Sequence, residues 1–367
     1  MNKLLFIVFA AFSAACSDTT PLPADPQATP ETRALYRNLF RIADEGVMFG
    51  HQDDALYGHD WKYEEGRSDV RECCGDYPAV FGWELGGLET GADRSIDDVP
   101  FAEITRLLCA AYGRGAVNTV SWHPQNPESG ASAWDGKTST AVSSILPGGA
   151  NHAQFRLWLD RLAGFFVGLK SADGTCAPVL FRPFHEHTGS GFWWGEAQCT
   201  PDEYKALWRF TVEYLRDVKG VHNLLYVYSP DLYRNAEHYT ERYPGDEWVD
   251  VLGLDAYHRP QDWDFLSGGE RMLSTLQRLG REHGKPTAFT ETGLEGIPDT
   301  AWWPRRLLPV IRGKGLSYVL VWRNAHDRPT HFFGPWHGHA SEPDFRKFAA
   351  NREQPVLFES QLPDMYH

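Results

Sequence analysis

The chain has 367 residues, and 49 Asp or Glu against 35 Lys or Arg give it a net charge of −14 at pH 7. Nucleic-acid binding needs clustered cationic side chains, so this charge argues against a nucleic-acid partner and, to a lesser degree, against an acidic polysaccharide. Hydrophobic residues make up 42% of the chain, which is enough for a large core. The chain is rich in aromatic residues, with 14 Trp, 15 Tyr and 21 Phe. Such rings can stack on sugars, although most rings in globular proteins belong to the core.

The first residues have the pattern of an export signal. Lys3 precedes an apolar run over residues 4–12, and small residues then lead to Cys16. This run is too short for a permanent membrane-spanning helix. The region before Cys16 resembles a bacterial lipobox, except that Ser13 stands where leucine is usual. We therefore expect residues 1–16 to be a secretory or lipoprotein signal, with Cys16 as the acylated residue if a lipid anchor is used.

Residues 17–30 are rich in Thr and Pro and lack periodicity, which suits a flexible or extended tether. The folded body would then span residues 31–367. The expected location is outside the inner membrane of a Gram-negative bacterium, in the periplasm or anchored to the outer membrane. Contact with a membrane is expected only through a lipid on Cys16.

Five cysteines follow Cys16, and their spacing matches no metal site. An exported protein can form disulfides, and one conceivable bond joins Cys73 or Cys74 to Cys109. An odd number of cysteines leaves at least one thiol free. The five are Cys73, Cys74, Cys109, Cys176 and Cys199.

Short hydrophobic runs alternate with amphipathic helical patterns along residues 31–367. A helix over about residues 31–43 precedes the first run. Residues 200–203 combine an N-cap threonine, a first-position proline and a capping-box glutamate, and residues 341–344 resemble this helix start. Eight runs are apolar throughout, as expected of parallel strands covered on both faces. They are residues 47–49, 79–81, 116–121, 178–182, 224–228, 249–254, 286–290 and 318–322.

Eight β-then-α units without a break in composition predict a single (β/α)8 TIM barrel. A doubly wound open sheet is the alternative, but no glycine-rich phosphate loop follows any of the strands. The active sites of such barrels lie at the carboxyl ends of the strands, and polar and aromatic residues collect there in this sequence. They are residues 50–53, 83–84, 122–123, 183–187, 229–231, 255–258, 291–292 and 323–324.

Two glutamates in this set point to the chemistry. Glu186 follows the fourth strand and Glu291 follows the seventh, so both can reach one pocket from opposite walls. Carboxyl groups about 5–5.5 Å apart define a retaining glycosidase, in which one is the nucleophile and the other the acid/base. That chemistry needs neither a cofactor nor a metal, and neither is expected.

Several further motifs accompany these glutamates. The set is Arg182-Pro183-Phe184-His185-Glu186, Phe289-Thr290-Glu291, Val321-Trp322-Arg323-Asn324, Trp122-His123-Pro124, Asp255-Ala256-Tyr257, Gly191-Phe192-Trp193-Trp194-Gly195 and Phe49-Gly50-His51-Gln52. With these motifs, the chain resembles glycoside hydrolase family 26 over residues 31–350. The resemblance implies a retaining hydrolase of β-1,4-mannosidic linkages in mannan, galactomannan, glucomannan and their oligosaccharides, of the mannan endo-1,4-β-mannosidase type.

The resemblance also implies roles for individual residues. Glu186 would be the acid/base, with a pKa raised enough to keep its proton. Glu291 would attack the anomeric carbon and form a glycosyl-enzyme, and Tyr257 would orient Glu291. The other candidates for binding substrate are His123 and Trp322 at the −1 sugar, His185 beside the acid/base, Trp194 on the leaving-group side, Arg323 at the −2 sugar, Asp255 as an orienting residue and Trp83 after the second strand.

Several alternatives remain at this stage. A family relative acting on another β-glucan or on β-xylan would use the same carboxylates. A non-catalytic glycan-binding lipoprotein is a further possibility, but it would gain nothing from retaining both glutamates. Internal cleavage and release of mannobiose from a chain end are equally open. His331, His337 and His339 fit no defined metal site and suggest a solvated or substrate-lining loop. We expect a monomer with a β-mannan or a mannooligosaccharide as its partner.

Overall fold

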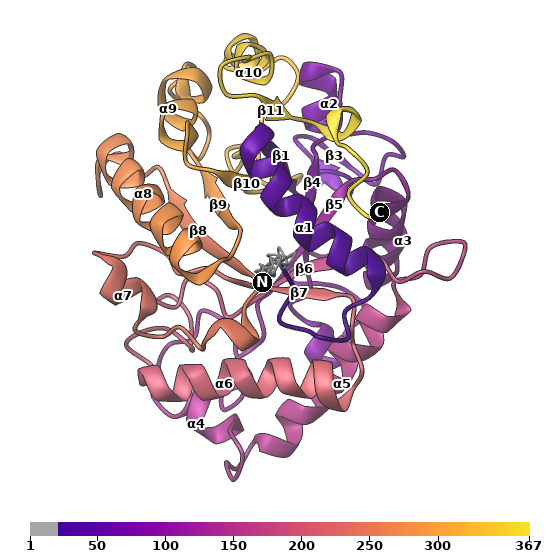
Figure 1. Ribbon diagram of the computed structural model, residues 1–367, viewed down its shortest axis with the longest axis vertical. Coiled ribbons are helices and arrows are strands. Elements are labelled where there is room, and N and C mark those ends of the chain that lie inside the picture. Colours follow the sequence, from indigo (N-terminus) through magenta and orange to yellow (C-terminus); the bar gives the residue numbers. More distant parts are fainter. Residues whose placement is uncertain (1–20) are drawn as a thin grey trace, which may run out of the picture.

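The computed structural model describes residues 21–367, so the predicted signal with Cys16 and the first part of the tether lie outside the described residues. Eight parallel strands, each hydrogen-bonded to the next, form the sheet, and the last pairs with the first. This closure confirms the (β/α)8 TIM barrel (Figure 1). The strands are β1 (Val47–Gln52), β4 (Val80–Glu84), β5 (Val117–Trp122), β6 (Val179–Pro183), β7 (Leu224–Tyr228), β8 (Val251–Tyr257), β9 (Thr287–Gly293) and β10 (Leu316–Val321).

Helices surround the barrel, and no helix among residues 21–367 is long and apolar enough to cross a membrane. A hairpin of β2 (Tyr57–Gly58) and β3 (Trp61–Lys62) follows β1, and β11 (Val356–Leu357) pairs with the start of β1. The α-helices are α1 (Pro30–Glu45), α2 (Asp69–Cys74), α3 (Phe101–Gly113), α4 (Ala141–Ile145), α5 (His152–Gly168), α6 (Pro201–Glu213), α7 (Ala236–Thr240), α8 (Phe265–His283), α9 (Leu308–Ile311) and α10 (Glu342–Ala349).

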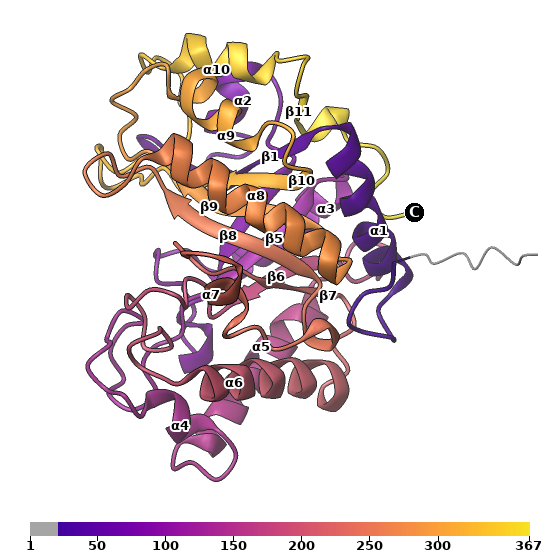
Figure 2. The same cartoon turned by 60° about the vertical axis from the view of Figure 1, so that its left-hand side comes forward.

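Helix α1 covers the amino-terminal end of the barrel. Its buried face, with Leu35, Leu39 and Ile42, belongs to the same hydrophobic cluster as barrel residues such as Met48 and Leu180. Figure 2 shows α1 and the C-terminus at one end of the barrel and long loops at the other. Because α1 and the interior side chains fill the amino-terminal end, the carboxyl end is left for a site.

The predicted tether over residues 17–30 extends too far. Asp25 is buried, and its carboxylate hydrogen-bonds the ring of His222 at 2.8 Å. The Ala24 N–H donates to the carboxylate of Asp250 at 2.6 Å. Individual hydrogen bonds therefore hold this segment against the barrel, although its sequence has no periodicity that would predict packing.

The two predicted helix starts differ in how they are capped. At α6, the Thr200 hydroxyl accepts from the Glu203 N–H while the Glu203 side chain accepts from the Thr200 N–H, which is the predicted capping box. At α10, Ser341 occupies the N-cap position, but its side chain makes no capping hydrogen bond. Its hydroxyl instead bonds the ring of His339 and accepts from Trp303.

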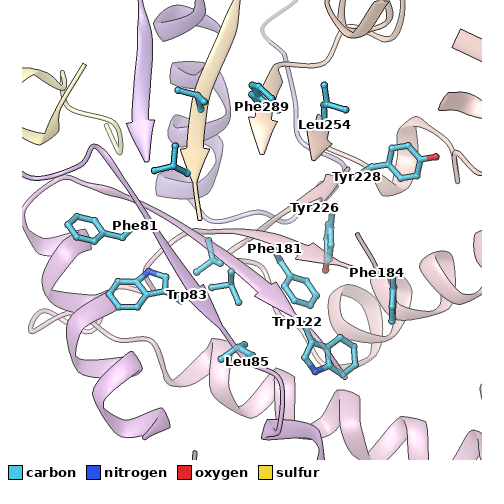
Figure 3. Packing of buried hydrophobic residues seen from close by; sticks show 14 of the residues in the cluster. Phe81, Trp83, Leu85, Trp122, Phe181, Phe184, Tyr226, Tyr228, Leu254 and Phe289 are labelled. Carbon is cyan, nitrogen blue, oxygen red and sulfur yellow. The ribbon is translucent and has the colours of Figure 1, made fainter. Parts of the chain in front are cut away.

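Large side chains fill the space between the strands and the helices. The cluster includes Phe81, Trp122 and Phe181, which Figure 3 shows together. All cysteines of residues 21–367 are free thiols, so the conceivable bond from Cys73 or Cys74 to Cys109 is not formed.

Candidate active site

Glu186 lies in a tight turn just after β6. Both Phe184 and Glu186 have left-handed backbones, with φ of 48° and 53°. Such conformations cost free energy in non-glycine residues and persist only where neighbours impose them. Here the Glu186 N–H donates to the Ser229 carbonyl at 2.9 Å, and the Tyr204 hydroxyl donates to the Phe184 carbonyl at 2.8 Å. These bonds anchor the turn that carries Glu186.

The surroundings of Glu186 favour its protonated form. Burial raises the pKa of Glu186 well above its ordinary value, and the nearby carboxylates of Glu291, Asp231 and Asp255 raise it further. The Arg182 guanidinium opposes this effect without cancelling it. These surroundings suit Glu186 to the role of a proton donor.

Glu291, on β9, has the opposite environment. Its two carboxylate oxygens accept hydrogen bonds of 2.5 Å, one from the Arg182 guanidinium and the other from the Tyr257 hydroxyl. Burial, followed by the charge of Glu291, raises the pKa of Tyr257, so its hydroxyl keeps the proton that it donates. Two donors, one of them cationic, hold Glu291 as an oriented carboxylate that is ready for nucleophilic attack.

A buried network beneath Glu291 sets the direction of Arg182. The second side of the guanidinium donates to Asp255 at 2.7 Å. Asp255 also accepts from the hydroxyls of Ser229 at 3.0 Å and Thr290 at 2.6 Å. Burial raises the pKa of Asp255 to about 7 against the pull of Arg182. Asp255 thus acts through Arg182.

His123 and His185 lie next to each other, with their Nε2 atoms 3.0 Å apart. The Nδ1 atom of His123 is 2.7 Å from the carboxylate of Glu84. Trp322 is half-buried, and its ring lies 6.3 Å from that of His123. The structure therefore brings the predicted residues of the −1 region together.

Arg323 lies at the end of β10, within a second polar cluster. Its guanidinium forms an ion pair with Asp97 at 3.0 Å and donates to the Tyr57 hydroxyl at 3.2 Å. Tyr57 in turn donates to Asp53 at 2.6 Å. Arg323 thus joins the hairpin after β1 to the loop after β4.

Two of the predicted substrate-binding residues lie elsewhere. Trp83 is fully buried beside Phe81 between the sheet and the helices, and its indole donates to Asn118 at 2.8 Å (Figure 3). Neighbouring residues in a strand point to opposite faces, so Glu84, not Trp83, points toward the site. The prediction for Trp83 is therefore wrong.

Trp194 is fully buried as well. Its indole donates to the His185 carbonyl at 2.8 Å, and its ring stacks on Phe192 at 4.5 Å. Trp194 therefore packs inside the loop and exposes no ring face to a sugar. The predicted platform role of Trp194 is wrong for this reason.

No individual role was predicted from the sequence for Arg182, Glu84 or Trp134. Arg182 could have been identified from the sequence, because a charged residue inside a buried strand needs a partner. Trp134 could not, since it lies in a polar loop. Its side chain is 54% exposed, and its ring stacks on His123 at 5.1 Å with an angle of 17°. An exposed ring at this position can face a sugar.

Known proteins share this arrangement of the chain. The sequence profile described as Glycosyl hydrolase family 26 matches residues 24–268. A β-mannanase structure of that family from Bacteroides ovatus aligns with a TM-score of 0.89 and 45% identity, over 92% of this chain and 98% of the other. An endo-β-1,4-mannanase structure from Cellulomonas fimi aligns at 0.86 and 36%, over 95% and 79%.

A mannan endo-1,4-β-mannosidase from Bifidobacterium adolescentis is 35% identical over 89% of this chain. The chain spans 34% of the length of that relative, so the similarity covers one region of the longer Bifidobacterium protein. Because the profile matches residues 24–268 and the similarities to these relatives extend over most of the chain, the chain belongs to glycoside hydrolase family 26.

Proposed function

We propose that the chain is a retaining endo-β-1,4-mannanase, with Glu291 as the nucleophile and Glu186 as the acid/base. The observation that carries the proposal is the contrast between these two glutamates. Glu291 accepts hydrogen bonds from Arg182 and Tyr257, whereas Glu186 is buried among carboxylates that raise its pKa. Such a contrast separates a nucleophile from a proton donor.

The reaction proceeds in two steps. In the first, a Glu291 oxygen attacks the anomeric carbon while Glu186 gives its proton to the departing glycosidic oxygen, which leaves a covalent glycosyl-enzyme. In the second, Glu186 takes a proton from water, and that water attacks the same carbon and releases Glu291. Two inversions give net retention, in keeping with a retaining family.

The substrate is proposed from the relatives. Those from Bacteroides ovatus, Cellulomonas fimi and Bifidobacterium adolescentis are all described as mannan-degrading enzymes. The ring of Trp134 and the half-buried ring of Trp322 flank His123, which supports a sugar substrate. Product analysis on mannan, a β-glucan and β-xylan tests this proposal, and hydrolysis of either of the latter without mannan would refute it.

The time course of products decides the mode of cleavage. Internal cleavage predicts a spread of oligosaccharide sizes early in the reaction. Mannobiose as the only early product would instead show release from a chain end.

Glu291→Gln should abolish turnover and leave sugar binding largely intact. Normal hydrolysis by this variant would refute the assignment of the nucleophile.

We further propose that the protein is exported. The support for export is the basic start and apolar run before Cys16. Fractionation of cells that express the full chain and a Cys16→Ala variant tests both export and the lipid anchor. Retention of the wild type in the cytoplasm would refute export, and equal membrane association of the two would refute the anchor.

A further inference from the structure

Glu84 is a buried carboxylate at the end of β4 with an unusually complete set of hydrogen-bond donors. Its Oε1 accepts from the N–H groups of Gly86 at 2.5 Å and His123 at 3.0 Å. Its Oε2 accepts from the Ser121 hydroxyl at 2.6 Å and contacts His123 Nδ1 at 2.7 Å. A carboxylate with this many donors is ionised, because a protonated one would have to give up an acceptor position. His123 Nδ1 therefore carries a proton.

The opposite nitrogen of His123 faces His185. Two ring nitrogens 3.0 Å apart share one proton, so one ring donates and the other accepts. The charges around the rings decide between them. His123 lies beside the anionic Glu84 and within the field of Glu291, whereas the cationic Arg182 is the largest charge effect that disfavours a proton on His185. The shared proton is therefore more stable on His123.

Protonation equilibria point the same way. Burial alone lowers the pKa of His123, but the charge of Glu84 and its hydrogen bond outweigh burial and raise it. Burial lowers the pKa of His185, and Arg182 and His123 lower it further. Of the two rings, His123 is therefore the one that holds a positive charge more readily.

We propose that Glu84 is a positioning residue that holds His123 as an imidazolium, with one N–H directed to Glu84 and the other to His185. The link from this arrangement to catalysis rests on the proposed function. Neither N–H of His123 is free for a sugar, so His123 acts through its neighbours. Its ring stacks on the exposed Trp134, and a positive charge strengthens such a stack. The hydrogen bond to His185 steadies the residue before Glu186.

The pH dependence follows from the groups that face His123. Glu84, Asp97 and Glu291 favour its charged form, while Arg182 and His185 oppose it. The imidazolium is present below the pKa of His123 and is lost as the pH rises through it. A glutamine at position 84 removes the strongest favourable charge, so the proton leaves at lower pH. We expect Glu84→Gln to lower the pH at which His123 loses its second ring proton by about one unit or more.

The test is nitrogen NMR of histidine rings in the full chain, between about pH 5 and pH 8. The His123 signals are assigned by their loss in His123→Asn. We expect two protonated ring nitrogens in the wild type at the acid end, and loss of the second ring proton at a lower pH in Glu84→Gln. Glu89→Gln is the matched control, because Glu89 is buried in the adjacent loop and bonds Trp122 and Gln125 instead of His123. It should leave the His123 signals unchanged.

A wild-type His123 with one bare nitrogen throughout would overturn the proposal, as would identical His123 signals in the wild type and Glu84→Gln. The first outcome decides the question even if Glu84→Gln fails to fold. A doubly protonated His123 in a chain that hydrolyses no mannan would refute the proposed function and leave the protonation state standing. The two failures are therefore distinguishable.

Discussion

Replacing Glu186 with glutamine removes the acid and keeps the shape of the side chain. The raised pKa of Glu186 favours the protonated form of the wild-type residue, and the variant loses the contribution of this acid. General acid–base catalysis contributes about 10²–10⁴-fold, or about 3–5 kcal/mol of barrier. We expect kcat/KM on mannan to fall by that factor.

The nature of the leaving group separates acid catalysis from a general loss of activity. A sugar oxygen needs a proton to depart, whereas a nitrophenolate does not. With an aryl β-mannoside, Glu186→Gln should therefore form the glycosyl-enzyme with a loss of less than about tenfold and then accumulate it, because no base activates water. Added azide needs no base and should restore turnover, giving a product of retained configuration.

A matched control is Glu196→Gln. Glu196 lies in the same loop with a side chain that is 43% exposed, and its partner is His238. This variant should hydrolyse mannan at the wild-type rate. Equal losses of Glu186→Gln on mannan and on the aryl mannoside, with no effect of azide, would refute the acid/base assignment. Wild-type activity should also decline as the pH rises through the raised pKa of Glu186, since the acid must carry its proton.

Three further substitutions probe the sugar platform, the nucleophile and the fold. Trp134→Ala should lower kcat/KM on short mannooligosaccharides by about 2–10-fold in steady-state assays, because one stacking contact is lost; unchanged values would show that Trp134 does not face the sugar. Tyr257→Phe removes a hydrogen bond to a charged group, worth about 1.5–3 kcal/mol, and should lower kcat by about 10–100-fold; full activity would contradict its orienting role. Thr200→Ala should lower the free energy of unfolding by about 1 kcal/mol in urea titrations while kcat/KM stays unchanged.

The barrel could be predicted because strands buried on both faces form continuous apolar runs. Each of the eight predicted runs overlaps one observed strand. The carboxyl ends of several were placed too early, as at β8, which continues to Tyr257, and β9, which continues to Gly293. The residues at these ends are polar and still pair within the sheet. The two-residue strands β2, β3 and β11 were not predicted, because such short segments carry no period.

The site could be predicted to the strand end but not always to the residue. Glu186 and Glu291 could be singled out because they follow the fourth and seventh strands on opposite walls of the barrel, and the structure places them in contrasting environments. After β4 the choice lay between Trp83 and Glu84, and the aromatic residue was the wrong one. Composition does not tell which of two neighbours points to the barrel mouth, since that depends on register. Trp194 failed for a related reason, because Phe192 covers it.

The surroundings that orient Glu291 come from the strands and not from the long loops. Arg182 and Tyr257 lie on β6 and β8, and both donate to Glu291. Since Asp255 holds the second side of the guanidinium, Arg182 cannot turn to Glu186 without leaving a buried carboxylate unpaired. The loops carry the contacts of Arg323 and the exposed ring of Trp134. Changes in residues 53–65 or 85–98 should therefore alter product size or sugar preference while Glu186 and Glu291 keep their roles.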